Sequence, residues 1–544
     1  MSQKFDVFST KFAQDTYLRK YSMDKKETWA DTSKRVVEAV CGNLLTQKEK
    51  NKIYKLILER KFIPGGRYLY SAGRPFHQVN NCFLFRAEDS REGWADIMEK
   101  STASLMTGGG IGIDYSLLRE KDALINRTGG KSTGPIALME MVNEAGRHIM
   151  QGGSRRSAIW AGLNWKHGDA AAFLKLKDWS PELRAMKDKD PEFRLPMEGT
   201  NISVIYDTDF FVAIEDEEHP DHKTAKSIWM SNCTQAFKTA EPGMSFNFRK
   251  DQESLRNACT EVVSKDDSDK CNLGTMWINQ FKDKDDFAQS CELATLFLLC
   301  GGIYSDVPTE KIKQVGLANN RIGLGLGGIH EWLMLRGQDY ECGPELHKWL
   351  SLYQESSDGA SYTGARRLRV SVPQGVRAIA PTGTIGIIAE TTTGIEPLFC
   401  KAYKRRYIDT EKDNQHNYQM VVDGSVKRLT DAGVKLDQIK DSFDISFKQR
   451  VKFQADVQKY VDMSISSTCN MPSWGSEANN ESTVQKNADT LLRYAKRLRG
   501  FTVYPDGARG GQPLTRVDLK EAMENEGKVF EEQEYNCVNG VCGL

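Results

Sequence analysis

Three side chains of different chemistry stand at alternate positions in the segment Asn257-Ala-Cys259-Thr-Glu261. A thiol can host a radical, a glutamate can act as a base, and an asparagine can donate and accept hydrogen bonds. If this segment is an extended finger of chain, residues two apart project to the same side, so that all three side chains would face one substrate. The segment therefore predicts a reaction centre.

Two further cysteines could supply electrons to such a centre. Cys271 lies twelve residues after Cys259, and Cys82 lies far upstream in Asn-Asn-Cys-Phe-Leu-Phe. The competing interpretation is structural, because cysteine is among the most often buried residue types and commonly serves as a small core side chain. The segment from 257 to 261 alone does not decide between these interpretations.

A second motif offers hydrogen-bond donors to a phosphate. It comprises Pro381, Thr382, Gly383, Thr384 and Ile385, and it opens into an apolar run. Hydroxyl and backbone N–H groups in such a loop can hold a phosphate, especially if a helix starts there. An ordinary Pro-Gly turn is the alternative.

The order and spacing of these motifs resemble those of the catalytic subunits of ribonucleotide reductases, and within them the adenosylcobalamin-dependent class II. Cys271-Asn272-Leu273-Gly274 and a cysteine pair at the tail add to the resemblance, which runs from about Phe62 to the C-terminus. It implies an α/β fold, namely a ten-stranded barrel of two five-stranded half-barrels with a central finger loop.

The sequence pattern agrees with an α/β architecture in three parts. Helix-like spacing at 34–40 and 47–61 predicts a helical N-terminal region, 1–61, too short for the ATP-binding module of some reductases. The barrel is expected over 62–515 and a flexible tail over 516–544. Within the barrel, β-rich runs at 82–85, 200–206 and 376–380 alternate with helical stretches at 93–106 and 135–150.

The resemblance also implies a role for each residue of the reaction centre. Cys259 would become a thiyl radical that removes the ribose 3′ hydrogen, and Glu261 would take the 3′-hydroxyl proton. Asn257 would hold the ribose hydroxyls. Cys82 and Cys271 would supply two electrons and end as a disulfide.

The tail carries Cys537 and Cys542 behind an acidic, polar stretch, so we expect it to be exposed. By the resemblance, this pair would re-reduce the active site and would itself be reduced by a thioredoxin- or glutaredoxin-like partner. Zinc binding is the competing interpretation, but no second Cys or His pair lies nearby to complete four ligands. We predict no metal ligands.

Substrate and effector contacts are carried over from the resemblance as well. Besides the phosphate loop, Gly66, Asn81 and Gly110 would border the ribonucleotide. The residues expected to bind a dNTP or ATP specificity effector are Asp89, Ser90, Arg91, Arg119 and Arg127, with Gln151 and Arg155 in a second regulatory loop. A solvated surface is the alternative for these arginines. The helical stretches at 92–106 and 135–150 have apolar faces that predict a homodimer.

The radical source separates the subclasses. Class I enzymes use a tyrosine pair near the C-terminus and a metal-bearing partner subunit, whereas the corresponding region here has the single Tyr504. Adenosylcobalamin is therefore the expected cofactor, and a class I large subunit is the alternative. The sequence does not name the cobalamin contacts.

Composition adds limits. The 544 residues contain 74 Lys plus Arg and 74 Asp plus Glu, so net charge gives no sign of a nucleic-acid or membrane surface. We find no apolar run near the length of a membrane span and no secretory core at the start, so a cytoplasmic location is expected. The glycine-rich stretches at 107–113 and 321–328 lack a nucleotide-binding context and predict close backbone packing.

Overall fold

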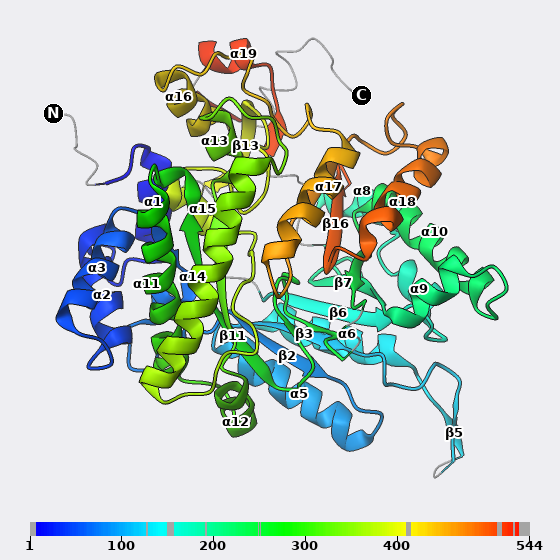
Figure 1. Cartoon of the computed structure of the whole chain (residues 1–544). Helices are drawn as coiled ribbons and strands as arrows, with labels where there is room; N and C mark the ends of the chain where they lie inside the picture. Colours follow the sequence, from blue (N-terminus) through cyan, green and yellow to red (C-terminus); the bar gives the residue numbers. More distant parts are fainter. Residues whose placement is uncertain are drawn as a thin grey trace.

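A computed structural model describes residues 7–126, 129–149, 157–190, 193–248, 250, 252–409, 415–508, 514–525 and 528–531. Its main feature is a ten-stranded sheet (Figure 1). The strands are β1 (Phe62–Pro64), β2 (Cys82–Arg86), β3 (Gly110–Asp114), β6 (Ile159–Asn164), β7 (Thr200–Tyr206), β8 (Gly243–Phe246), β11 (Asp269–Trp277), β12 (Ile322–Gly327), β15 (Thr468–Met471) and β16 (Gly500–Pro505).

The strand order describes two parallel halves joined at two seams. Strands β2, β3, β6, β7 and β8 pair in parallel. In the other half, β11 pairs with β12, and bridges from Leu324 to Arg377 and from Ile379 to Ile465 continue in parallel toward β15 and β16. The halves meet antiparallel at β11–β2 and at β8–β16. The predicted α/β barrel is confirmed, although 376–380 contributes bridges rather than a named strand.

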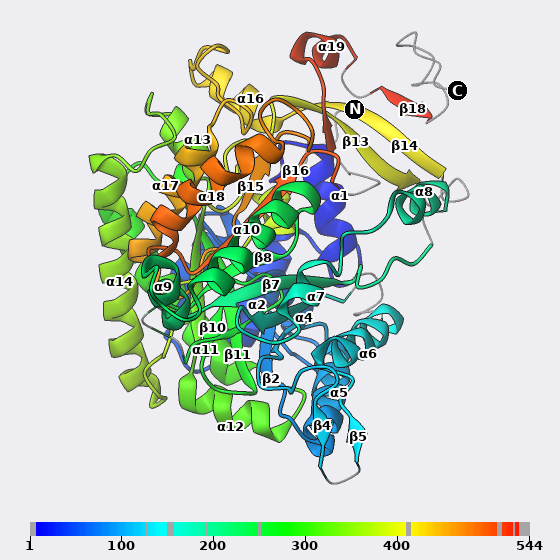
Figure 2. The ribbon, with the colours of Figure 1, turned by 90° about the vertical axis from the view of Figure 1, so that its right-hand side faces the viewer.

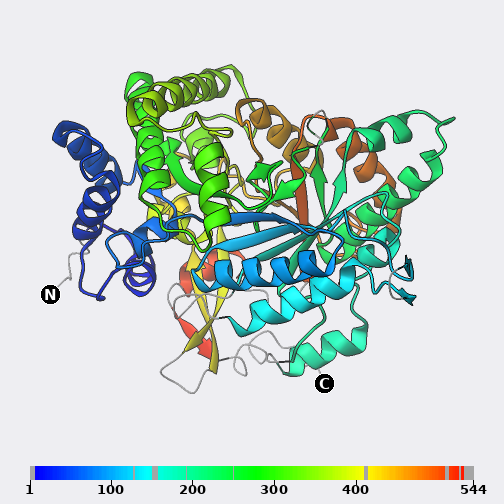
Figure 3. The same cartoon turned by 90° about the horizontal axis from the view of Figure 1, so that it is seen from below.

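Helices cover the outside of both halves because their apolar faces pack on the sheet. The longer ones are α5 (Arg91–Met106), α6 (Pro135–His148), α10 (His222–Thr239), α11 (Lys284–Tyr304), α12 (Glu310–Asn319), α14 (Pro344–Leu368), α17 (Phe447–Val457) and α18 (Glu481–Ala495). Shorter ones are α7 (Ala170–Leu174), α8 (Pro181–Lys189), α9 (Thr208–Glu215) and α13 (Ile329–Met334). Figure 3 shows α5 and α6 side by side on one face.

Three helices precede the barrel: α1 (Lys11–Lys20), α2 (Trp29–Cys41) and α3 (Gln47–Leu58). Capping boxes begin α2 at Thr28 and α3 at Thr46, where each side chain satisfies a backbone N–H of the first turn. Buried side chains of these helices, such as Trp29 and Ile57, belong to the same hydrophobic cluster as Leu298 of α11. The N-terminal helices therefore share the core of the barrel (Figure 1).

A smaller four-stranded sheet has the order β17-β13-β14-β18. Its strands are β13 (Ala402–Asp409), β14 (Gln415–Val422), β17 (Leu514–Arg516) and β18 (Val529–Glu531), with α16 (Gly424–Asp431) and α19 (Leu519–Glu524) nearby (Figure 2). Within the predicted tail, 516–544, the described residues up to 531 include α19 and β18, and residues 532–544 lie outside the described part of the chain. The hairpin of β13 and β14 offers two strand edges, and β17 and β18 pair with them.

Helix α11 is long and apolar enough, by length and composition, to cross a membrane, which the sequence analysis did not anticipate. Its most apolar window is 61% buried inside the protein. The helix packs against β11, β12 and α14, so its apolar composition matches a core position. The length and apolar composition of α11 are therefore only weak evidence for a membrane span.

Candidate active site

A short hairpin, the finger (residues 255–264), runs through the barrel. It consists of β9 (Leu255–Arg256) and β10 (Val263–Ser264), paired antiparallel, and it packs against β2, β3 and β6. A Cβ atom added to Gly112 of β3 would lie 1.8 Å from the carbonyl oxygen of Arg256. Only glycine therefore allows the finger to pass this close to the barrel wall.

The tip of the finger is a turn, not the extended segment that the sequence analysis expects. The N–H of Thr260 donates to the carbonyl of Asn257 at 3.0 Å, and the N–H of Val262 donates to Asn257 Oδ1 at 3.0 Å. Thr260 has φ of +70°, a left-handed conformation that is strained for a β-branched residue. The turn, rather than strand alternation, sets the directions of the three predicted side chains.

Cys82 and Cys271 are direct cross-strand partners in the antiparallel pair of β2 and β11. Residues opposite one another in such a pair have Cα atoms about 4.5–5.5 Å apart, within the range that a disulfide bridges. Both are thiols here, and no described cysteine is in a disulfide. Burial raises the pKa of each thiol well above its usual value, so both stay protonated.

Asn257 connects the finger to this pair. Its Nδ2 lies 2.8 Å from Cys82 Sγ, and the side chain is fully buried. Its Oδ1 accepts the N–H of Val262, the residue after Glu261, so one amide holds both a reductant thiol and the turn that carries the predicted base. The structure thus brings Asn257 together with the predicted site, although it contacts other site residues rather than bordering the cavity.

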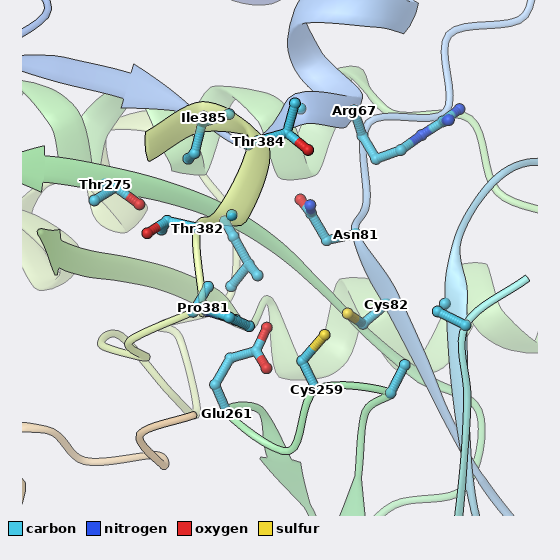
Figure 4. A pocket seen from close by; sticks show the side chains of 18 of the residues that line it. Arg67, Asn81, Cys82, Cys259, Glu261, Thr275, Pro381, Thr382, Thr384 and Ile385 are labelled. Atoms are coloured by element: carbon cyan, nitrogen blue, oxygen red, sulfur yellow. The ribbon is translucent and has the colours of Figure 1, made fainter. Parts of the chain in front are cut away.

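Cys259 is half-buried and lines a cavity of about 190 Å³. Figure 4 shows its sulfur turned toward the sulfur of Cys82. Cys82 borders the same cavity, whereas Cys271 lies behind it, fully buried. A thiol that is open to the cavity therefore stands in front of a buried thiol pair.

Glu261 lines the cavity beside Cys259 and is almost completely buried. Burial raises its pKa from 4.5 to about 7, although its own backbone N–H and the nearby amide of Asn257 partly oppose the shift. Its Oε2 has no hydrogen-bond partner among the described residues. A carboxyl group that titrates near neutral pH and keeps one oxygen unused is suited to general base catalysis.

The predicted phosphate loop forms the opposite wall. All five residues from Pro381 to Ile385 line the cavity, and α15 (Gly383–Ala389) starts within the loop. Thr382 has φ of +53°, and its buried Oγ1 has no hydrogen-bond partner among the described residues. In Figure 4 the loop faces Glu261 and Cys259 across the cavity. The loop thus keeps a hydroxyl available to a ligand, as a phosphate site requires.

The remaining predicted substrate residues lie on the same cavity. Gly66 begins α4 (Gly66–Ser71), Asn81 precedes β2, and Gly110 is the parallel partner of Cys82 on β3. In the part of the chain that the structure describes, the buried Oδ1 of Asn81 has no hydrogen-bond partner. The cavity is thus bordered by three unused polar oxygens, on Asn81, Glu261 and Thr382.

Sequence reasoning missed several residues that line this cavity. Thr275 stands at the second alternate position after Cys271 on β11, so strand alternation from Cys271 could have found it. Arg67 follows Gly66 directly. Tyr21, by contrast, follows the N-terminal helix α1 and carries no local signal that points to the barrel.

Comparison with known proteins agrees with this geometry. A family model described as "Ribonucleotide reductase, barrel domain" matches residues 80–348 and 373–504. The chain belongs to the ribonucleotide reductase family. A vitamin B12-dependent ribonucleoside-diphosphate reductase of Thermoplasma acidophilum is 26% identical over 88% of this chain and 68% of its own length.

Two further comparisons bear on the subclass and the fold. A putative adenosylcobalamin-dependent ribonucleoside-triphosphate reductase of Mycobacterium phage D29 is 24% identical over 85% of this chain and 76% of its own length. The solved class Id ribonucleotide reductase alpha subunit of Actinobacillus ureae aligns with a TM-score of 0.71 over 92% of this chain and 97% of its own. At 16% identity, that likeness shows the fold alone.

The four predicted effector residues of this reductase that the structure describes, Asp89, Ser90, Arg91 and Arg119, lie at the surface. Asp89 and Arg119, thirty residues apart, form an ion pair at 2.8 Å. Ser90 caps α5 through the N–H of Gly93, and exposed Arg91 pairs with Glu92. The hairpin of β4 (Leu124–Ile125) and β5 (Gly130–Lys131) projects beside α5 and α6 (Figure 2). The structure therefore brings Asp89 and Arg119 together without showing an effector.

Several predicted residues of the reductase lie outside the described residues. These are Arg127 and the second-loop residues Gln151 and Arg155, together with the tail cysteines Cys537 and Cys542. The roles of these five residues remain predictions.

Among the described residues, no group of three or more His, Cys, Asp or Glu side chains could hold a metal ion.

Proposed function

We propose that the chain is an adenosylcobalamin-dependent, class II ribonucleotide reductase that converts ribonucleotides to 2′-deoxyribonucleotides. One observation carries the proposal. A single cavity is bordered by Cys259, by Glu261 with a pKa near 7, by one thiol of the Cys82–Cys271 pair, and by a phosphate loop. A radical-capable thiol, a base and a two-electron reductant are the groups that this reaction needs.

In the proposed mechanism, the Cys259 thiyl radical takes the 3′ hydrogen of the ribose, so the thiol re-forms and the unpaired electron moves to the 3′ carbon. Glu261 accepts the proton of the 3′ hydroxyl, which assists departure of the 2′ hydroxyl as water. Asn257 hydrogen-bonds Cys82 and the backbone N–H of Val262, and so holds the thiol against the turn that carries Glu261. Cys259 finally returns its hydrogen atom to the 3′ carbon.

Cys82 and Cys271 supply the two electrons and two hydrogens that the reduction consumes, and they become a disulfide. Their cross-strand pairing supports this role, because the disulfide could form without a change of strand register. Their raised pKa values keep them as thiols, which are hydrogen donors, until the substrate arrives. The net change is one ribonucleotide and two thiols to one deoxyribonucleotide, one disulfide and water.

The cofactor is inferred from the cobalamin-dependent relatives and from the access to Cys259. Three small residues, Gly110, Ala158 and Ala258, lie together on the cavity wall, and Ala258 directly precedes Cys259 in the chain. Cys259 itself lines the cavity, so its sulfur is reachable from it. In β16, Val503 is buried beside the single Tyr504, where a class I enzyme has a tyrosine pair. When bound, adenosylcobalamin supplies a radical by cleavage of its cobalt–carbon bond, and Cys259 is the residue that would receive it.

The phosphate loop, Gly66, Asn81 and Gly110 are proposed to hold the ribonucleotide. Asp89, Ser90, Arg91, Arg119 and Arg127 are proposed to bind a dNTP or ATP effector, with Gln151 and Arg155 in the loop between the two sites. The paired Asp89 and Arg119 beside the β4–β5 hairpin support this placement. A bound nucleotide phosphate would compete with Asp89 for the guanidinium of Arg119.

We also propose a homodimer through α5 and α6. Exposed apolar side chains on and near these helices support it: Met106, Leu124 and Met141 are 63%, 69% and 47% exposed. We further propose three parts, 1–61, 62–515 and 516–544, with the redox pair Cys537 and Cys542 lying beyond residue 531. A thioredoxin- or glutaredoxin-like dithiol in the cytoplasm would reduce that pair.

The test is to incubate the purified chain with a ribonucleotide, a dithiol and adenosylcobalamin and to measure deoxyribonucleotide. We expect product from the unaltered chain and none above background from Cys259→Ser. Cys342→Ser is the matched control, because Cys342 is a buried thiol beside His347, outside the cavity. Product formation by Cys259→Ser, or none by the unaltered chain, would refute the proposal.

A class I large subunit is the second candidate, since the chain shares its fold with a class Id alpha subunit. That enzyme would require a separate partner subunit as radical source. Product from the purified chain with adenosylcobalamin alone would exclude it, whereas activity that depends on an added partner and not on cobalamin would favour it.

A further inference from the structure

The N-terminal helix α1 reaches the substrate cavity through one side chain. Tyr21 follows the last residue of α1, is 5% exposed and lines the cavity. A Cβ atom added to Gly66 would lie 2.8 Å from the Tyr21 hydroxyl and 3.0 Å from its ring. The phenol therefore lies directly against the glycine at the start of α4, so a larger residue at 66 would displace it.

The other end of α1 is fastened to the helix that carries the phosphate loop. Glu390, the residue after α15, accepts hydrogen bonds from the N–H and hydroxyl groups of Ser9 and Thr10 at 2.7–3.0 Å. Arg60 Nη1 completes an ion pair with Glu390 at 2.7 Å. We call Ser9, Thr10, Arg60 and Glu390 the clamp. It fixes α1 relative to α15.

Helix α1 thus spans two elements that border the cavity. The clamp attaches its beginning to the end of α15, and Tyr21 at its end lies against Gly66. Arg67, next to Gly66, and Thr384 of the phosphate loop border the same cavity, and α1 packs against α15, the helix that starts in this loop. Helix α1 therefore brings the phenol to the cavity while it lies along the helix that carries the phosphate loop.

We propose that Tyr21 is a substrate-binding residue whose hydroxyl donates a hydrogen bond to a phosphate oxygen of the ribonucleotide, and that the clamp holds it in place. This inference rests on the proposed function. A phenol is a neutral donor, and a hydrogen bond to an anionic oxygen is stronger than one between neutral groups. It assigns the region before the barrel a direct part in the site.

The test compares ligand binding in the full chain, without adenosylcobalamin or dithiol, so that no turnover occurs. Calorimetry measures the affinity of the chain for a ribonucleoside diphosphate and for the triphosphate. Displacement of the bound diphosphate measures the affinity for the corresponding nucleoside. Tyr21→Phe removes only the hydroxyl. We expect nucleotide binding to weaken by about tenfold or more, with nucleoside binding unchanged.

The control is Tyr17→Phe on the same helix, because the hydroxyl of Tyr17 bonds the carbonyls of Glu27 and Thr28 rather than the cavity. We expect it to lower the thermal midpoint without a phosphate-specific change in affinity. Glu390→Gln should weaken nucleotide binding to a smaller extent than Tyr21→Phe. Circular dichroism of each variant establishes that it is folded.

Two outcomes would overturn the inference. Unchanged nucleotide binding in Tyr21→Phe would show that the hydroxyl makes no contact, and equal losses for nucleotide and nucleoside would move the contact away from the phosphates. Failure of the proposed function looks different. In that case Tyr21-dependent nucleotide binding persists, and no deoxyribonucleotide forms in the complete reaction mixture.

Discussion

The tip of the finger and the clamp each bury a glutamate, but the two carboxylates have opposite surroundings. Among the described residues, Glu261 has no cationic partner and one of its oxygens has no hydrogen bond, and burial raises its pKa to about 7. At Glu390, burial also acts to raise the pKa, but hydrogen bonds from Arg60 and Ser9 outweigh it and lower the pKa below 4.5. A buried carboxylate with partners stabilises the fold, whereas one without partners is available for reaction.

Replacing the unpartnered carboxylate should affect the rate most. Glu261→Gln keeps the size of the side chain but removes the base, so we expect kcat to fall by about 10²–10⁴-fold. Rapid-quench measurement of deoxyribonucleotide formation checks this. A variant that retains more than a tenth of the unaltered rate would show that Glu261 is not the base, and the comparison with Glu390 would lose its functional meaning.

Moving the finger should disrupt the site as a whole. Gly112→Ala would place a methyl group 1.8 Å from a backbone oxygen of the finger, so we expect a loss of about 3 kcal/mol in unfolding free energy together with most of the activity. Gly359→Ala in α14 is the control, because no atom lies within 4 Å of its added Cβ. This control should gain about 0.5–1 kcal/mol. If urea unfolding showed the same change in unfolding free energy for both substitutions, the close approach of Gly112 to the finger would be contradicted.

The two glutamates should also respond to pH with opposite signs. The raised pKa of Glu261 favours folding below pH 4.5, and that stability is lost as pH rises through about 7, at a cost of about 3 kcal/mol. Glu261→Gln should therefore be more stable than the unaltered chain at pH 8 and similar to it at pH 4.5. Urea unfolding at both pH values measures the difference.

The same titration sets the rate. Since the base must be ionised, kcat/KM of the unaltered chain should rise as pH increases through about 7, and this limb should be absent in Glu261→Gln. A rise centred near pH 4.5 would show that burial does not perturb this carboxyl group.

Opening the clamp should have the smallest effect. Glu390→Gln removes the charge that pairs with Arg60, so we expect a loss of about 1–3 kcal/mol at neutral pH. The lowered pKa of Glu390 means that this contribution is present above pH 4.5 and disappears as pH falls through the folded-state value. The unfolding free energy of Glu390→Gln should therefore be lower than that of the unaltered chain at pH 7 and equal to it at pH 3.

Much of the fold and site could be predicted from local sequence. The helical spacing at 93–106 and 135–150 and the strand run at 200–206 correspond to α5, α6 and β7. The phosphate loop and the cysteines were identified from their chemistry and order. The turn at the finger tip could not be predicted, because the left-handed φ of Thr260 is imposed by contacts with distant segments such as Gly112 and Ser464.

The sequence by itself determined which functional groups this reductase has: its thiols, the carboxyl group of Glu261, the amide of Asn257 and the hydroxyl-rich loop, in an order that identifies the family. Only the tertiary structure decided how they act together. It placed Cys82 and Cys271 opposite each other on two strands, buried Glu261 with no cation beside it among the described residues, and brought Tyr21 from the N-terminal helix to Gly66. The physical reason is that pairing, desolvation and proximity arise between segments far apart in the chain, so no local pattern of residues contains them.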